Sequence, residues 1–118
     1  MTVHRGDVVL ALYPFSSGAG ASRRPAVVVQ NDRDNARMAN TIIAQITTNL
    51  QHAAEPTHLS IVAASREGRQ MGLLHDSVIS CNNVATVRED RIDRVIGRVP
   101  DILLPRLDAC LKAALGLS

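Results

Sequence analysis

The apolar residues of this chain are gathered in short runs separated by turn residues, and this feature restricts the possible folds most. The runs are rich in Val, Ile and Leu, as is usual for β-strands, while Gly, Pro, Asn and Asp lie between many of them. The polar segments 31–35 and 66–72 are expected to be a turn and a connection. Strands are expected at residues 8–13, 26–30, 41–47, 57–62, 73–80, 84–87 and 95–99.

The C-terminal segment has a different pattern and predicts a helix over residues 101–115. Its leucines recur at the spacing of one helical face, namely Leu104, Leu107, Leu111 and Leu115. Asp101 is a candidate cap at its start, and Gly116 follows its end, where glycine is favoured. A shorter helical turn is expected in the charged segment 88–94.

Many short strands followed by one closing helix indicate a mainly β fold with α. We expect residues 1–118 to form one domain, a small barrel or curled antiparallel sheet of about five to seven strands. The chain has no Trp, one Tyr and one Phe. Its core must therefore be built from Val, Ile, Leu and Ala.

Charge and cysteine content narrow the functional classes only partly. The formal net charge is +2, too small to indicate nucleic-acid binding by itself. Lys112 is the only Lys, and Arg suits bidentate contacts to phosphate, although a GC-rich genome would explain the same bias. Cys81 and Cys110 lack metal-ligand or redox spacing. No signal peptide or membrane span is evident, so a cytoplasmic protein without membrane contact is expected.

Arg23-Arg24-Pro25, followed by a β-branched run that ends in Gln30, resembles the MazF/PemK toxins, which carry a basic residue and Arg-Pro before such a strand. The resemblance continues in the same order along almost the whole chain. Its other pieces are Arg5-Gly6-Asp7, Ile46-Thr47-Thr48, Pro56-Thr57-His58, Asp76-Ser77-Val78, Arg91-Ile92 and Ile96-Gly97.

This resemblance implies an SH3-like barrel with a C-terminal helix, of the CcdB/PemK type. It implies a homodimeric, ribosome-independent endoribonuclease toxin that needs no metal or other cofactor. Such toxins cut single-stranded RNA, usually mRNA, at short sequence motifs, and a cognate antitoxin neutralises them. The family's catalytic Arg precedes the Pro of the second strand, which gives that role to Arg24. Its catalytic Thr ends the third strand, which gives that role to Thr47.

RNA carries its own nucleophile, which suits these two residue types. The 2′-OH attacks the adjacent phosphorus and expels the 5′ oxygen, leaving a 2′,3′-cyclic phosphate and a 5′-OH. The enzyme must orient this attack and stabilise charge on the phosphate oxygens. The fork of Arg24 suits the second task, and the hydroxyl of Thr47 can donate to a phosphate oxygen or hold the 2′-OH in line.

The sequence leaves the general acid and base open. Some relatives carry an Arg and an acidic residue on the strand after Asp-Ser, and the corresponding positions here are Ser80 and Asn82. Neither carries protons well. The histidines that remain as alternatives are His4, His52, His58 and His75.

Further RNA contacts are expected around the catalytic pair, from the small-residue loop after the first strand, from Arg23 and from polar residues beyond Thr47. Single-stranded RNA is read by stacking and by hydrogen bonds to base edges. Phe15 is either a stacking platform beside this loop or a core residue. The candidate RNA-binding residues are Phe15, Ser16, Ser17, Arg23, Thr48, Asn49, Ser77 and Asn82.

Two other functions remain as alternatives. CcdB-type toxins share this barrel and bind DNA gyrase without cutting nucleic acid, but their C-terminal contacts include a Trp. This chain has no Trp and ends in Gly116-Leu117-Ser118, which argues against a gyrase poison. A toxin-derived binding module without catalysis is disfavoured by the intact pair of Arg24 and Thr47.

Overall fold

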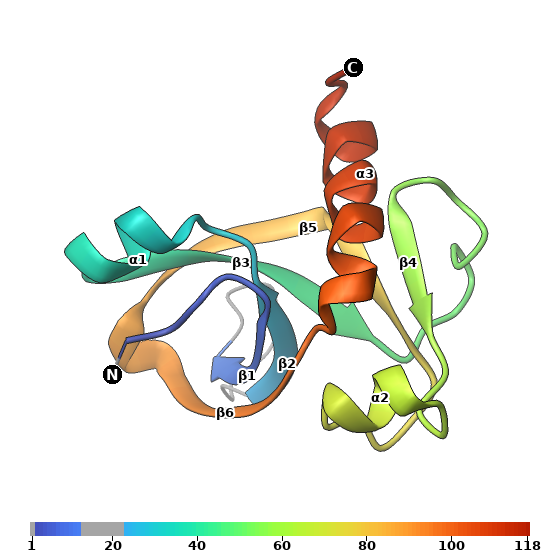
Figure 1. Cartoon of the computed structure of the whole chain (residues 1–118), viewed down its shortest axis with the longest axis horizontal. Coiled ribbons are helices and arrows are strands. Elements are labelled where there is room, and N and C mark those ends of the chain that lie inside the picture. Colours follow the sequence, from blue (N-terminus) through green and yellow to red (C-terminus); the bar gives the residue numbers. More distant parts are fainter. Residues whose placement is uncertain (1, 13–22) are drawn as a thin grey trace, which may run out of the picture.

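Six strands form one antiparallel sheet in the computed structural model, which describes residues 2–12 and 23–118 (Figure 1). The strand order is β4-β5-β3-β2-β1-β6. The strands are β1 (Asp7–Leu12), β2 (Arg23–Val28), β3 (Asn40–Thr47), β4 (His58–Ile61), β5 (Ser77–Arg88) and β6 (Ile92–Arg98). The helices are α1 (Asp32–Arg37), α2 (Arg66–Gln70) and α3 (Leu104–Leu115), with 3₁₀ turns η1 (Glu89–Arg91) and η2 (Asp101–Leu103).

This architecture confirms the mainly β fold with a C-terminal helix. The sheet is curved, and β4 and β6 are its outermost strands. The pairs among the described residues do not join β4 to β6, so full closure into a barrel stays a prediction. None of the described helices is long and apolar enough to cross a membrane.

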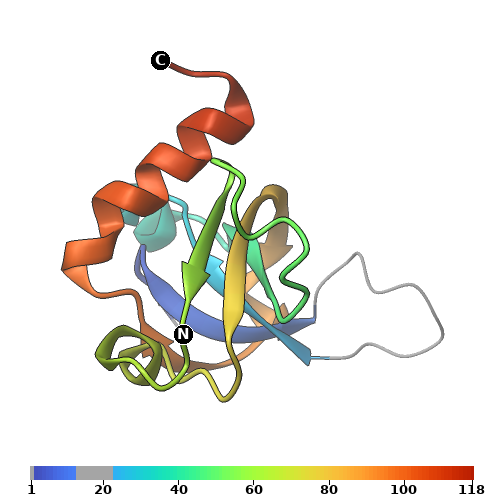
Figure 2. The same cartoon turned by 90° about the vertical axis from the view of Figure 1, so that its right-hand side faces the viewer.

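Helix α3 packs across one face of the sheet (Figure 2). Leu107 is fully buried there, whereas Leu115 is 62% exposed. The leucine stripe is therefore a core face at the start of the helix and a surface at its end. Cys110 of α3 and Cys81 of β5 are free, buried thiols. Burial raises the pKa of Cys81 to about 12, so this thiol is inert at neutral pH.

Strand β5 is continuous, although its sequence predicted two pieces. The expected break between the two pieces lies where the pairing of β5 with β3 is irregular. Ala44 pairs with Val84, but the next residue, Gln45, pairs with Ser80. Residues 81–83 are therefore extra on β5, and such an insertion bends a strand and increases its twist.

The polar segments 31–35 and 66–72 were predicted to be a turn and a connection, and this prediction is wrong. The structure has short helices there, α1 starting in the first segment and α2 lying in the second. Asn31 caps α1, with its side chain accepting a hydrogen bond from the backbone N–H of Asp34 at 2.9 Å. Ser65 caps α2 in the same way, accepting from Gly68 N–H at 3.0 Å. A capping side chain of this kind stabilises a helix start by about 1 kcal/mol.

The ends of the other elements also differ from the prediction. Asp101 begins the 3₁₀ turn η2 and is no side-chain cap, because α3 starts only at Leu104. Pro105 consequently lies in the first turn of α3, where the missing N–H of proline costs least. The expected turn over residues 88–94 shrinks to η1, and β6 already begins at Ile92. Gly116 ends α3 in the left-handed conformation, with φ of 70°, as predicted.

The Arg5-Gly6-Asp7 motif joins the start of β1 to other elements. The Arg5 guanidinium donates to Asp108 of α3 at 2.5 Å and to the carbonyl of Val29 at 3.1 Å. Asp7 is nearly buried and accepts from Arg98 of β6 at 3.3 Å. These contacts give the motif a structural role, since they tie α3 and β6 to the same turn.

Asp32 extends this junction to α1 and makes stability depend on pH. Its carboxylate accepts from the backbone N–H of Arg5 at 2.6 Å, and this hydrogen bond lowers the pKa of Asp32 below its usual 3.8. Because the folded-state pKa is depressed, the ionised group stabilises the fold above its usual pKa, and this contribution is lost as the pH falls through the folded-state pKa. Between roughly pH 5 and pH 2, wild type should therefore lose more free energy of unfolding than Asp32→Asn. Urea unfolding across this range measures the difference, and parallel profiles would contradict it.

Candidate functional site

Arg24 and Thr47 lie at the same end of two neighbouring strands. The hydrogen-bonded register of β2 and β3 sets Ala26 opposite Gln45. Arg24 and Thr47 each lie two residues beyond that pair, in the same direction. Residues two apart on a strand point to the same face, and cross-strand neighbours share a face. The structure therefore brings these two predicted residues together on one face of the sheet.

Neither side chain is committed to the core. Arg24 is exposed, and within the described residues no acidic side chain forms an ion pair with it. Thr47 is half-buried, and its Oγ1 accepts a hydrogen bond from the backbone N–H of Asn49 at 3.1 Å. This contact orients the hydroxyl and leaves its proton available for donation. The pair thus offers an uncommitted guanidinium and a positioned hydroxyl.

A cavity of about 450 Å³ opens near the same end of β2 and β3 as this pair. One wall is a row of cross-strand neighbours, because Leu10 on β1 pairs with Pro25 on β2 and with Arg94 on β6. The other wall comes from residues 72–75 and from Ser77 at the start of β5.

Thr48 also lines this cavity. Pro25 directly follows Arg24, and Thr48 directly follows Thr47. Arg24 and Thr47 themselves do not line the cavity. Successive side chains on a strand point to opposite faces, so the cavity lies at the same end of β2 and β3 but on the other face of the sheet.

The other predicted RNA-binding residues fall into different environments. Thr48 and Ser77 line the cavity, and the Ser77 hydroxyl donates to the carbonyl of His75 at 2.7 Å. Arg23 is exposed and lies 3.7 Å from the carboxylate of Asp93. Phe15, Ser16 and Ser17 lie outside the described residues.

Two asparagines among these candidates have side chains engaged within the chain. The Asn49 side chain accepts from Gln51 N–H at 3.1 Å. Asn82 donates to Thr57 Oγ1 at 3.2 Å, on the β4 side of the sheet. Each must give up such a contact before it can read a base edge through the same atom.

Two of the four histidines form a cluster near β4. His52 Nδ1 lies 3.2 Å from Glu55, and the rings of His52 and His58 are 5.8 Å apart. The side chain of His58 is only 8% exposed, and its Nδ1 lies 2.8 Å from Thr57 Oγ1. The cluster ties residues 48–57 to β4, and it supports a structural role for His58. In the described part of the chain, no group of three His, Cys, Asp or Glu side chains is arranged to hold a metal ion.

His75 is exposed and lines the cavity near Arg24 and Thr47. Its neighbour Asp76 accepts from the backbone N–H of Ala63 at 2.9 Å. That carboxylate thus stabilises the loop before β5. The arrangement supports a surface turn for these two residues.

Among the exposed residues that line the cavity, sequence reasoning missed Leu74 and Arg94, and it considered His75 only as a proton carrier. They come from the loop before β5 and from β6, far apart in the chain. No spacing in the sequence links them, because the cavity forms only where β1, β2 and β6 meet this loop.

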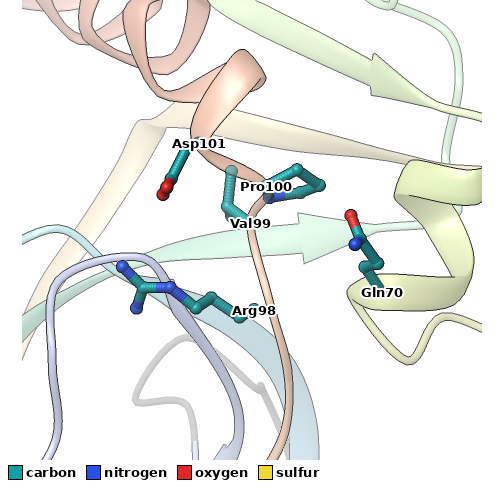
Figure 3. Close-up of a pocket in the computed structure, with 5 residues that line it drawn as sticks. All are labelled: Gln70, Arg98, Val99, Pro100 and Asp101. Atoms are coloured by element: carbon teal, nitrogen blue, oxygen red, sulfur yellow. The ribbon is translucent and has the colours of Figure 1, made fainter.

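A second cavity, of about 340 Å³, lies between α2 and the end of β6 and is lined by Gln70, Arg98, Val99, Pro100 and Asp101 (Figure 3). Arg98 pairs with Asp7 at the start of β1, whereas Arg24 pairs with Ala11 near its end. The guanidinium of Arg98 already donates to Asp7 and to the carbonyl of Arg5. This cavity therefore lies away from the candidate catalytic pair, and its cation is engaged in the fold.

Comparisons with known proteins agree with these features. Residues 4–115 match the family described as PemK-like, MazF-like toxin of type II toxin-antitoxin system. The endoribonuclease EndoA of Bacillus subtilis (strain 168) is 33% identical over 118 residues, which cover 99% of this chain and 97% of that protein.

Solved structures share the fold. An endoribonuclease from a mycobacterial species superposes with a TM-score of 0.77 at 20% identity, over 99% of this chain and 94% of its own. A mycobacterial endoribonuclease in complex with its cognate antitoxin gives 0.76 at 22% identity, over 98% of this chain and 97% of its own. The chain belongs to the PemK-like, MazF-like toxins of type II toxin-antitoxin systems.

Proposed function

We propose that this chain cleaves single-stranded RNA at a site formed by Arg24 and Thr47, and that the attacking group is the 2′-OH of the RNA itself. The class of enzyme rests on family membership and on the EndoA relative: the chain is an endoribonuclease toxin. The observation that carries the site is the placement of both side chains on one face, at the same end of β2 and β3.

The two residues divide the work between charge and orientation. As the 2′-oxygen bonds to phosphorus, negative charge grows on the non-bridging oxygens, and the Arg24 guanidinium stabilises it with paired N–H donors. The Thr47 hydroxyl, held by Asn49 N–H, donates to a phosphate oxygen and keeps the attacking oxygen in line. The 2′-OH loses its proton as its oxygen bonds to phosphorus, and the 5′ oxygen takes up a proton as its bond to phosphorus breaks. A 2′,3′-cyclic phosphate remains on one fragment and a 5′-OH on the other, with no net gain or loss of protons.

The surroundings support RNA contacts by Thr48 and Ser77, because both line the cavity near the pair. Arg23 adds an exposed cation one residue before Arg24, and its 3.7 Å contact to Asp93 is loose and solvated. A phosphate can replace such a partner at little cost. Contacts by Asn49, Asn82, Phe15, Ser16 and Ser17 stay predictions.

The partners follow from the same proposal. A cognate antitoxin binds and neutralises the chain, and the support is that a mycobacterial endoribonuclease of the same fold is in complex with its cognate antitoxin. We also propose a homodimer, because exposed apolar side chains on the sheet and on α3 need cover. These are Ile42 on β3, Val95 on β6 and Leu115 on α3.

The deciding experiment incubates the purified protein with a long single-stranded RNA in EDTA and maps the ends of the products. We expect cleavage at a short recurring sequence, with 2′,3′-cyclic phosphate and 5′-OH ends, because the scheme uses only protein side chains and the 2′-OH. Replacing the 2′-OH by hydrogen at the cut nucleotide should abolish the cut. Cleavage that needs a divalent metal, or products with 5′-phosphate ends, would contradict the mechanism. Growth arrest without any RNA cleavage would favour a protein target instead.

A further inference from the structure

The cavity near Arg24 and Thr47 has an apolar interior and a polar rim. Its buried and half-buried lining is apolar, apart from the hydroxyl of Ser77, and comes from Leu10, Pro25, Gly72, Leu73 and Ile96. Its exposed lining carries Thr48, Leu74, His75 and Arg94. Sites for small organic rings have this character, and a volume of about 450 Å³ lies within their usual range.

The rim offers hydrogen-bond donors and a stacking surface. In the described part of the chain, Arg94 forms no ion pair or hydrogen bond through its side chain, so its guanidinium is available to a ligand. Leu74 is 88% exposed, and its apolar side chain can cover one face of a ring. Ser77 donates its proton to the His75 carbonyl, which leaves its oxygen as an acceptor.

The position of the cavity relates it to the cleavage site. Successive side chains on a strand point to opposite faces, so Pro25 in the cavity wall lies across the sheet from Arg24. In a nucleotide the sugar separates the base from the phosphate. A phosphate at Arg24 and Thr47 thus allows the base of the same or the next nucleotide to turn over the ends of β2 and β3 into the cavity.

We propose that this cavity is a subsite for one nucleobase of the RNA, that of a nucleotide adjoining the scissile phosphate. The inference rests on the proposed function and adds to it the residues that select the base. Because Arg94 supplies only donors, the favoured base presents carbonyl oxygens at its edge, as uracil and guanine do. Leu74 and the apolar lining contribute through contact with the ring faces.

The test uses a short RNA that contains one mapped cut site, with an abasic nucleotide placed at each position in turn. A bidentate contact from an Arg to a base edge contributes roughly 10- to 100-fold, so one abasic position next to the cut should lower kcat/KM of the wild type by about that factor. The same substrates are then cleaved by Leu74→Ala and Arg94→Gln, two exposed positions whose replacement leaves the fold intact.

Both variants should cleave intact RNA more slowly than wild type does. With the RNA that is abasic at the sensitive position, both variants and wild type should cleave at the same rate. Matched controls are Val62→Ala, another exposed apolar residue, and Arg91→Gln, another exposed Arg near β6. Neither lines the cavity, and neither should change the ratio. Swapping the base at the sensitive position for each of the others should rank uracil or guanine first, with the ranking flattened in Arg94→Gln.

Two results would overturn the subsite. Either the variants slow intact and abasic RNA by the same factor at every position, or they cleave all substrates like wild type. In both cases the wild type still cuts RNA, so the proposed function stands while the subsite fails. Absence of cleavage of any RNA by wild type would instead overturn the proposed function. An RNA with deoxyribose at the cut nucleotide binds but cannot be cut, and fluorescence anisotropy measures its affinity. Both variants should bind this strand more weakly than wild type, which shows the loss without the chemical step.

Discussion

Arg24→Ala should lower kcat for RNA cleavage by roughly 10²- to 10³-fold, the usual effect of removing one donor that stabilises a developing oxyanion. Arg24 is exposed and, within the described residues, forms no ion pair. Its removal should therefore leave the thermal unfolding midpoint unchanged. Single-turnover cleavage of a labelled RNA, with saturating protein, measures the chemical step directly.

Two further variants separate the possible reasons for a loss at Arg24. Arg24→Lys keeps the charge but loses the paired donors of the guanidinium, so its rate should fall between those of Arg24→Ala and wild type. Arg33→Ala removes another exposed cation, on α1, and should cleave at nearly the wild-type rate. If Arg24→Ala cleaves within about threefold of wild type, Arg24 does not stabilise the transition state.

The placement of Arg24 beside Thr47 shows how far sequence reasoning reaches. Each residue was identified by its motif, but their meeting depends on the register that sets Ala26 opposite Gln45. Register is fixed by long-range pairing and by which side chains the core accepts, and no local pattern contains it. The cavity has the same origin, because its walls meet only after β1, β2, β6 and the loop before β5 have assembled.

The fold was predictable where the pattern was long and regular. The strands appeared as β-branched runs. The leucines on one face predicted a helix over residues 101–115, and α3 spans Leu104–Leu115 of that range. Helices α1 and α2 span only six and five residues, too few for a periodic pattern to be read. Their capping residues Asn31 and Ser65 were visible in the sequence, and a search for caps would have located both starts.

Gly97→Ala should destabilise the fold by about 3 kcal/mol, near the upper end of the usual range for added volume in a packed site. A Cβ on Gly97 would lie 2.4 Å from the carbonyl carbon of Met71 and 2.5 Å from the carbonyl oxygen of Gln70. Both are backbone atoms, so no side-chain rotation relieves the clash. Gly72 approaches β6 from the other side, since its own Cβ would lie 2.2 Å from the carbonyl oxygen of Ile96.

These two glycines explain why the Ile96-Gly97 pair of the family motif is needed here: it lets the turn after α2 touch β6 through backbone alone. The control is Gly116→Ala, because no atom lies within 4 Å of its added Cβ, although Gly116, unlike Gly97, has a positive φ, of 70°. That variant should lose only about 1 kcal/mol, from backbone strain. The midpoint of thermal unfolding should fall by roughly 10 °C for Gly97→Ala and by much less for Gly116→Ala.

Equal shifts of the midpoint for the two variants would mean that the turn after α2 moves aside freely. The cavity wall at Gly72 and Ile96 would then be adaptable, and a base bound there would be selected less strictly than the close backbone contact implies.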